Sequence, residues 1–161
     1  MVSRLERERA AASRIDLWHA TAHVKAPLVV EYLIDLLAGS EATREGKVLV
    51  FGHHKHMLDT VEAALAAPPA GDGTGQKGLG WSPGVDQVRI DGSTPAAERA
   101  RLVRLFHDSN RCRLALVSTR AGGVGLDLTP AHIVVFAELD WIPGQLLQAE
   151  DRAYRMTSKK A

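Results

Sequence analysis

The segment RLALVSTRAGGVGLDLTPAHIVVFAE, residues 113–138, places two short apolar runs on either side of a glycine-rich stretch. Both runs are almost continuously apolar. They lack the alternation of apolar and polar residues that a strand with one solvent-exposed face shows. Such runs are typical of strands in a parallel sheet that is covered on both faces. The segment therefore predicts two buried strands, at residues 113–118 and 132–138, joined by a loop.

The rest of the chain alternates between short apolar runs and stretches with helical periodicity. Strands are expected at residues 47–52 and 86–92, and helices at residues 56–67, 94–108 and 143–156. In the middle helix, Thr94 suits the N-cap and Pro95 the first turn. This alternation predicts an α/β fold, with a mainly parallel sheet flanked by helices in three layers.

Two further segments complete the expected organisation. Residues 1–24 predict an exposed, charged N-terminal helix or linker, and Pro27 then opens an amphipathic helix that stops at Gly39. Residues 25–161 form the main domain, interrupted by a loop insertion rich in Gly and Pro at residues 66–84. Inside the insertion, GDGTGQKG is similar to a phosphate loop, but Gly78 stands where that motif requires Ser or Thr.

Composition excludes several classes of protein. The 161 residues are 45% apolar and 24% charged, and the net charge of +1 provides no global field for nucleic acid. The single cysteine, Cys112, excludes an internal disulfide, and we expect it to be a buried thiol in an intracellular protein. His53, His54 and His56 lack a carboxylate or cysteine at ligand spacing, so we expect no metal. No apolar run approaches the roughly 20 residues of a membrane span.

Polar segments follow each predicted strand, and ligands of such sheets gather at the carboxyl ends of the strands. The segments are GHHKH (52–56), DGST (91–94), STRAGGVGLDLT (118–129) and ELDW (138–141). In the third, Gly122, Gly123 and Gly125 let the backbone approach a phosphate closely, although a tight turn would also explain them. The hydroxyls of DGST could contact a nucleic-acid backbone or simply cap the next helix.

The last predicted helix carries QAEDRAYR, residues 148–155. Gln148, Arg152 and Arg155 share a narrow arc of this helix, opposite its apolar side chains. Two guanidiniums held together on a rigid element suit a transferring phosphoryl group. The alternative is an i,i+4 ion pair between Asp151 and Arg155, which explains one of the two arginines.

The motifs together resemble the second, C-terminal RecA-like lobe of Swi/Snf-related superfamily-two DNA-dependent ATPases. The resemblance runs from about Lys25 to Arg155, outside the insertion. It rests on KVLVFGHHKHMLD, RIDGSTPAAERARLVRLFHD and LVSTRAGGVGLDLTPAHIVVFAELDWIPGQLLQAEDRAYR. The paired histidines and VVFAELDW are most similar to the annealing-helicase branch, which remodels stalled replication forks.

The resemblance implies a role for each matching position. Arg152 and Arg155 would be arginine fingers, and Gly125, Asp127 and Gln148 would face the nucleotide. The residues that would contact the DNA backbone are His53, His54, Lys55, Asp91, Gly92, Ser93, Thr94, Ser118, Thr119, Arg120, Gly122 and Gly123. Contacts of this kind position a protein on DNA without reading its sequence.

The sequence departs from the family pattern in three ways. It contains neither a phosphate-loop lysine nor an Asp-Glu pair of the first lobe, so ATP with Mg²⁺ would be held mainly by an N-terminal lobe. The chain ends in MTSKKA where the family continues, so we expect an excised domain or a truncated product. Ile142 and Tyr154 replace the common asparagine and histidine.

The resulting expectation is the C-terminal motor lobe of an ATP-dependent DNA translocase or annealing helicase, inactive without its N-terminal lobe. It would act on branched or forked DNA in replication-fork repair in the nucleus. The alternatives are a non-catalytic lobe that binds DNA or protein, and a chromatin remodeller of the same superfamily. No membrane partner is expected, and the oligomeric state is open.

Overall fold

The structure is a computed structural model, and it describes residues 4–39, 46–67, 79–81, 84, 86–122 and 126–138. Four parallel strands form one sheet in the order β2-β3-β1-β4. The strands are β1 (Lys47–Gly52), β2 (Gln87–Ile90), β3 (Leu114–Ser118) and β4 (Ala131–Phe136). All four predicted strands are confirmed, and so is the parallel sheet.

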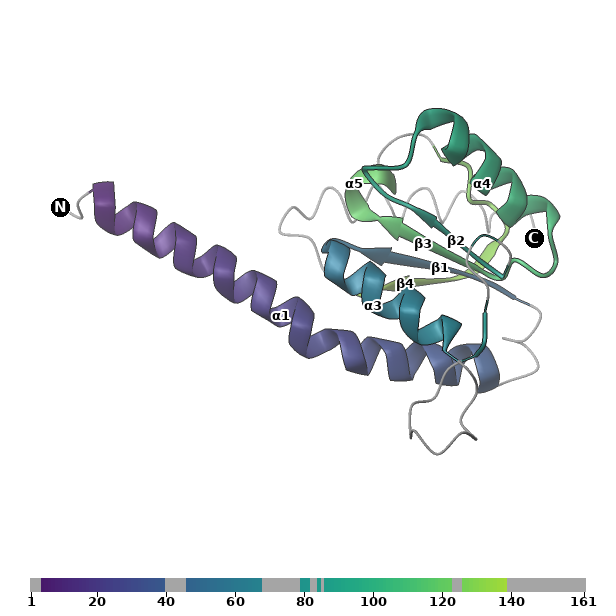
Figure 1. Cartoon of the computed structure of the whole chain (residues 1–161), viewed down its shortest axis with the longest axis horizontal. Helices are drawn as coiled ribbons and strands as arrows, with labels where there is room; N and C mark the ends of the chain where they lie inside the picture. Colours follow the sequence, from purple (N-terminus) through teal and green to yellow (C-terminus); the bar gives the residue numbers. More distant parts are fainter. Residues whose placement is uncertain are drawn as a thin grey trace, which may run out of the picture.

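Each face of the sheet is covered by helices. Val48 and Val50 of β1 point to one face, where they pack with α1 (Arg4–Gly39) and α3 (Lys55–Ala66). Leu49 and Phe51 point to the other face, toward α4 (Ala96–Asp108) and the short helix α5 (Thr119–Gly122). The strands are almost continuously apolar because both of their faces are buried. The three-layer α/β fold is therefore confirmed (Figure 1).

Helix α1 differs from the expectation at Pro27. The helix runs from Arg4 to Gly39 without a break, so Pro27 lies inside it and does not begin a second helix. A proline inside a helix costs about 3 kcal/mol through a lost hydrogen bond and a steric clash. Burial of Ala22, Ala26, Leu33 and Leu37 along one face of the helix offsets that cost.

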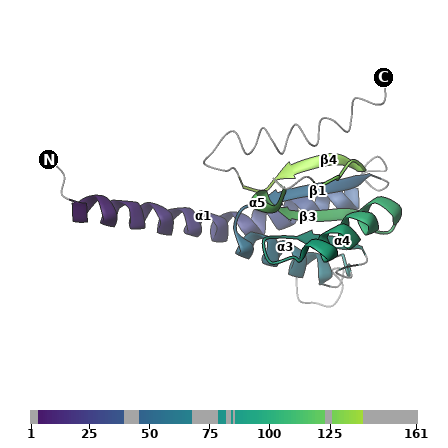
Figure 2. The same cartoon turned by 90° about the horizontal axis from the view of Figure 1, so that it is seen from above.

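The two halves of α1 have different surroundings. Its second half packs beside α3, and its first half extends past the sheet (Figure 2). The face opposite the buried residues carries four large exposed apolar side chains, Leu17, Val24, Leu28 and Tyr32. Among the described residues, no helix is both long and apolar enough to cross a bilayer.

Two other expectations meet local differences. Pro95 is the N-cap of α4, and the hydroxyl of Thr94 instead accepts a hydrogen bond from the backbone of Asp91, so Thr94 as the N-cap is wrong. The glycine-rich loop begins with the helix α5, which the sequence did not predict. Most of the insertion (68–78, 82, 83) and the predicted helix 143–156 lie outside the described residues.

Lys47 joins the sheet to the end of α4. Its buried ammonium donates hydrogen bonds to the carbonyls of Phe106, of His107 at 3.4 Å and of Ser109 at 2.8 Å. Those carbonyls belong to the last turn of the helix and to its C-cap, where no intrahelical donors are available for them. Burial lowers the pKa of Lys47. The neighbouring thiol of Cys112 is fully buried, as predicted, and burial raises its pKa to about 11.

We expect Lys47→Met to lower the free energy of unfolding by about 1–3 kcal/mol, because it leaves buried carbonyls without a donor. Methionine keeps the apolar part of the lysine side chain, so the loss of stability measures the contribution of the ammonium group. Urea unfolding measures the change. Arg101→Met, which removes an exposed ion pair with Glu98, is the control and should leave stability unchanged. Equal stability of Lys47→Met and the wild type would contradict the capping role.

Candidate functional site

A cavity of about 510 Å³ opens at the carboxyl edge of the sheet. The loops after β1, β2 and β3 all reach it, as the parallel sheet predicts. Helix α1 supplies a further wall. The lining residues are Trp18, His19, His53, His54, Lys55, Leu58, Asp91, Gly92, Ser93, Ser118 and Arg120. Segments that are far apart in the sequence therefore converge on one site.

Glu138, just beyond β4, fixes the loop after β1. One carboxylate oxygen accepts the backbone N–H groups of His53 and His54, both at 2.8 Å. The other lies 2.5 Å from Nδ1 of His54. Glu138 and His54 are 5% and 7% exposed, so this contact is almost free of competing water. Because a carboxylate can only accept, it holds the imidazole proton on Nδ1 and leaves Nε2 to face elsewhere.

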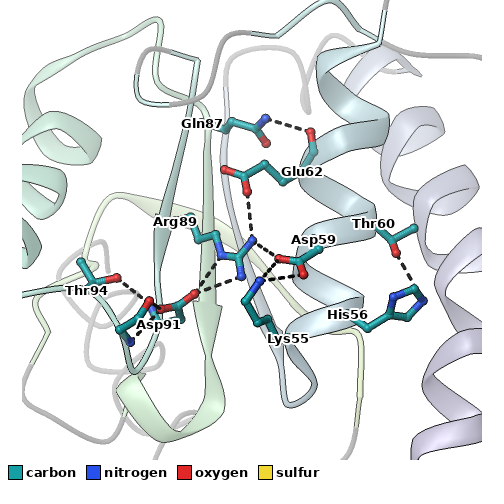
Figure 3. A network of polar contacts seen from close by, with 10 residues as sticks. Lys55, His56, Asp59, Thr60, Glu62, Gln87, Arg89, Asp91 and Thr94 are labelled. Carbon is teal, nitrogen blue, oxygen red and sulfur yellow. Dashed lines mark hydrogen bonds and ion pairs between the residues drawn. The ribbon is translucent and has the colours of Figure 1, made fainter.

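Arg89, on β2, fixes the loop that follows that strand (Figure 3). Its guanidinium contacts Asp59 at 2.6 Å and Glu62 at 3.0 Å, both on α3. It also contacts Asp91 at 3.0 Å, at the start of the DGST loop. Asp59 in turn accepts hydrogen bonds from Lys55. The guanidinium of Arg89 thus links β2, α3 and the DGST loop.

Hydrogen bonds keep the carboxylates of this network ionised. The side-chain hydrogen bond from Ser93 lowers the pKa of Asp91, and Arg89 lowers it further. Burial alone would raise the pKa of Asp59, but the hydrogen bonds from Lys55 and Arg89 outweigh burial and lower it. Asp91 therefore acts as a charged anchor inside the loop, and the side chain of Ser93 is held at its rim.

The structure brings eight of the predicted DNA-binding residues together in the cavity lining. They are His53, His54, Lys55, Asp91, Gly92, Ser93, Ser118 and Arg120. Two others point inward: Thr94 accepts from the Asp91 backbone, and buried Thr119 donates to the carbonyl of Gly52 at 3.2 Å. Gly122 ends α5, and Gly123 lies outside the described residues.

The predicted nucleotide site is not assembled by the described residues. Gly125, Gln148, Arg152 and Arg155 lie outside them. Asp127 is described and does not line the cavity; its carboxylate accepts the N–H of Thr129 and its carbonyl contacts His107 at 2.8 Å. The hydrogen bond from Thr129 lowers the pKa of Asp127, and an ionised carboxylate repels phosphate. Asp127 is thus the one described member of the predicted nucleotide site, and the site as a whole stays a prediction.

Three residues of the cavity lining were not identified from the sequence: Trp18, His19 and Leu58. Glu138 lies in the ELDW segment that was expected at this edge, but its role in holding the loop after β1 was not predicted. A tryptophan and a histidine side by side in an otherwise charged helix were the available signal for the first two. Among the described residues, no group of three or more His, Cys, Asp or Glu side chains is placed to hold a metal ion.

Comparison with known families adds a match over most of the chain. The family model of the helicase conserved C-terminal domain matches residues 28–157. A solved structure, the C-terminal part of the Fun30 ATPase domain, superimposes with a TM-score of 0.63 at 28% identity. The match covers 79% of this chain and 36% of the Fun30 chain.

Two similar relatives carry related names. The Xenopus laevis SWI/SNF-related matrix-associated actin-dependent regulator of chromatin subfamily A-like protein 1 is 42% identical over 139 residues, covering 86% of this chain and 12% of the relative. The mouse DNA annealing helicase and endonuclease ZRANB3 is 38% identical over 140 residues, covering 87% and 11%. The chain spans about a fifth or less of the curated relatives that it matches.

We expect Glu138→Gln to lower the free energy of unfolding by about 1–3 kcal/mol, because the buried amide cannot accept from both N–H groups and from Nδ1 of His54. Urea unfolding measures the loss. The matched control is Glu98→Gln, at an exposed ion pair on α4, which should leave stability unchanged. If both variants unfold like the wild type, Glu138 does not hold the loop.

Proposed function

The chain belongs to the helicase conserved C-terminal domain family, and from that premise we propose that it is the C-terminal motor lobe of a DNA-dependent ATPase. Its part in the motor is to hold the backbone of one DNA strand in the cavity at the carboxyl edge of the sheet. The observation that carries this proposal is the convergence of eight motif residues from three separate loops on that cavity.

The chemistry of the lining suits phosphate. Lys55 and Arg120 are exposed cations at its edge, and the hydroxyl of Ser118, whose oxygen accepts the N–H of Ala121, can donate its proton to a ligand. Lys55 also pairs with Asp59 at 2.9 Å, so a phosphate would share this ammonium with a carboxylate. We therefore assign the larger contribution to Arg120. Such contacts go to the DNA backbone, and they suit a protein that moves over any sequence.

The carboxylates close to the cavity do not oppose this role. Asp91 is paired with Arg89, and Glu138 is enclosed by the N–H groups of His53 and His54 together with the imidazole of His54. Their negative charge is thus directed inward, toward donors of the protein itself. Besides Leu58 and the paired Asp91, the lining offers a ligand the cations Lys55 and Arg120, the hydroxyl of Ser118 and the rings of Trp18 and His19, which supports an anionic occupant.

The finer part of the proposal concerns substrate and reaction. We propose branched DNA as the substrate and the nucleus as the location, supported by relatives such as the mouse DNA annealing helicase. ATP with Mg²⁺ would supply the energy, held mainly by an N-terminal lobe. Arg152 and Arg155 keep the arginine-finger role that their motif implies, and they lie outside the described residues.

The purified chain should bind DNA weakly, without sequence preference and with strong dependence on salt. Arg120→Ala should weaken binding to all sequences and lower the slope of log affinity against log salt by about 1, because one phosphate contact is lost. Lys55→Ala should have a smaller effect. Fluorescence anisotropy with labelled DNA at several salt concentrations measures both changes.

The control for this experiment is Arg101→Ala, which removes an exposed arginine of α4 that does not line the cavity. It should leave both the affinity and the salt slope unchanged. If Arg101→Ala and Arg120→Ala weaken DNA binding equally, binding is nonspecific and the cavity is not the DNA site.

The arginine-finger role is tested in an enzyme that contains both lobes, made by joining this chain to the first lobe of the mouse relative. Arg155→Ala should lower DNA-stimulated ATP hydrolysis by about 10³-fold or more while DNA affinity stays unchanged. Arg104→Ala, on the exposed side of α4, is the control and should keep full hydrolysis. Loss of DNA binding in parallel with hydrolysis would contradict the assignment.

A further inference from the structure

Helix α1 contributes two aromatic side chains to the cavity, Trp18 and His19, which we call the aromatic wall and which no motif of the family accounts for. Both residues precede the first strand of the sheet by nearly thirty residues. The wall is attached to the rest of the site by ring contacts. The ring centroid of Trp18 lies 4.4 Å from that of His53 and 4.2 Å from that of His54.

The aromatic wall is held in place through His54 by the hydrogen bonds that His54 makes with Glu138. Trp18 meets the ring of His54 edge-to-face at 61°, and His19 meets the same ring at a centroid distance of 4.8 Å. His54 cannot turn away, because Glu138 binds both its Nδ1 and its backbone N–H. The position of Trp18 is therefore set by a buried, charge-assisted contact, and the wall is preorganised before a ligand arrives.

A buried polar atom beside this wall lacks a partner. His54 is 7% exposed and lines the cavity, and its Nε2 has no hydrogen-bond partner among the described residues. Leaving such an atom unpaired costs free energy, and this nitrogen is itself closed to solvent. The cavity that His54 lines thus combines the aromatic rings of Trp18 and His19 with the cations Lys55 and Arg120.

This combination distinguishes between possible anionic ligands. A free phosphate or the outer backbone of a duplex needs cations and hydroxyls, and it gains nothing from an indole ring. Bases in a duplex are stacked on their neighbours, so their faces are covered. An unpaired nucleotide carries a phosphate, a sugar and a base with a free π-face, and aromatic side chains hold such bases in many proteins that bind single strands. A volume of about 510 Å³ falls within the range of small-ligand sites.

We propose that Trp18 and His19 bind the base of an unpaired nucleotide whose phosphate is held by Arg120. This inference rests on the proposed DNA-binding function and sharpens it. It makes the preferred DNA one with at least one unpaired nucleotide, such as a single strand or the junction of a fork. Helix α1 becomes part of the DNA-binding surface.

The experiment compares three labelled probes with the full chain: an oligo-dT strand, a strand of equal length made of abasic sites, and a duplex. Trp18→Ala should weaken binding of oligo-dT by about fivefold or more, the lower end of the effect of removing one base–aromatic stack. Binding of the abasic strand should not change. His19→Ala, at an exposed position, should have a smaller effect of the same kind, and Trp18→Phe should restore most of the affinity.

The control is Leu17→Ala, at a neighbouring position of α1 that is 68% exposed and does not line the cavity. It should bind all three probes like the wild type. A second measurement does not depend on truncating Trp18. In a Trp81→Phe, Trp141→Phe background, oligo-dT should quench the emission of Trp18 and the abasic strand should not.

Two results would overturn the inference while leaving the proposed function intact. Equal loss of affinity for oligo-dT and the abasic strand in Trp18→Ala would mean that Trp18 only supports the loop after β1. Unchanged emission of Trp18 on oligo-dT binding would exclude contact with a base. Absence of binding to every probe by the wild type would instead contradict the proposed function itself.

Discussion

The carboxylate of Glu138 is the contact on which the site depends. It sits at the end of β4 and accepts three hydrogen bonds from the neighbouring loop after β1, in surroundings almost closed to water. The parallel register makes this possible, because Phe51 pairs with Phe136 and the N–H of Ala137 donates to the carbonyl of Phe51 at 2.9 Å. A shift of that register by one residue would turn Glu138 to the other face of the sheet.

Arg89 holds a loop in the same way at the opposite edge of the described sheet. The order β2-β3-β1-β4 places β2 and β4 at opposite edges of the described sheet, and each edge carries one charged anchor. Arg89 holds the DGST loop through Asp91, and Glu138 holds the GHHKH loop through His54. The loop after β3 lies between them and adds Ser118 and Arg120 to the lining. Two contacts of charged side chains therefore position the loops on either side of the cavity.

Periodicity and the parallel-sheet rule were enough to predict the strands, the layers and the convergence of three loops, because each depends on local pattern and on the direction of the chain. Other features depend on contacts between distant segments. Helix α1 continues through Pro27 because Ala26, Leu33 and Leu37 are buried beneath it, which local propensity cannot reveal. Trp18 and Glu138 belong to the site only because α1 and β4 end up beside the loop after β1.

The two kinds of contact in the cavity share one property that matters for a motor. Cations and hydroxyls bind phosphates that are the same in every nucleotide, and an indole ring can meet the π-face of any base. Neither kind of contact distinguishes one base sequence from another. The aromatic wall would therefore make the cavity selective for DNA with an unpaired nucleotide without making it selective for sequence. Since Glu138 fixes the imidazole of His54 and, through it, the ring of Trp18, the base would be positioned by a buried carboxylate, while Arg120 would hold the phosphate from the loop after β3.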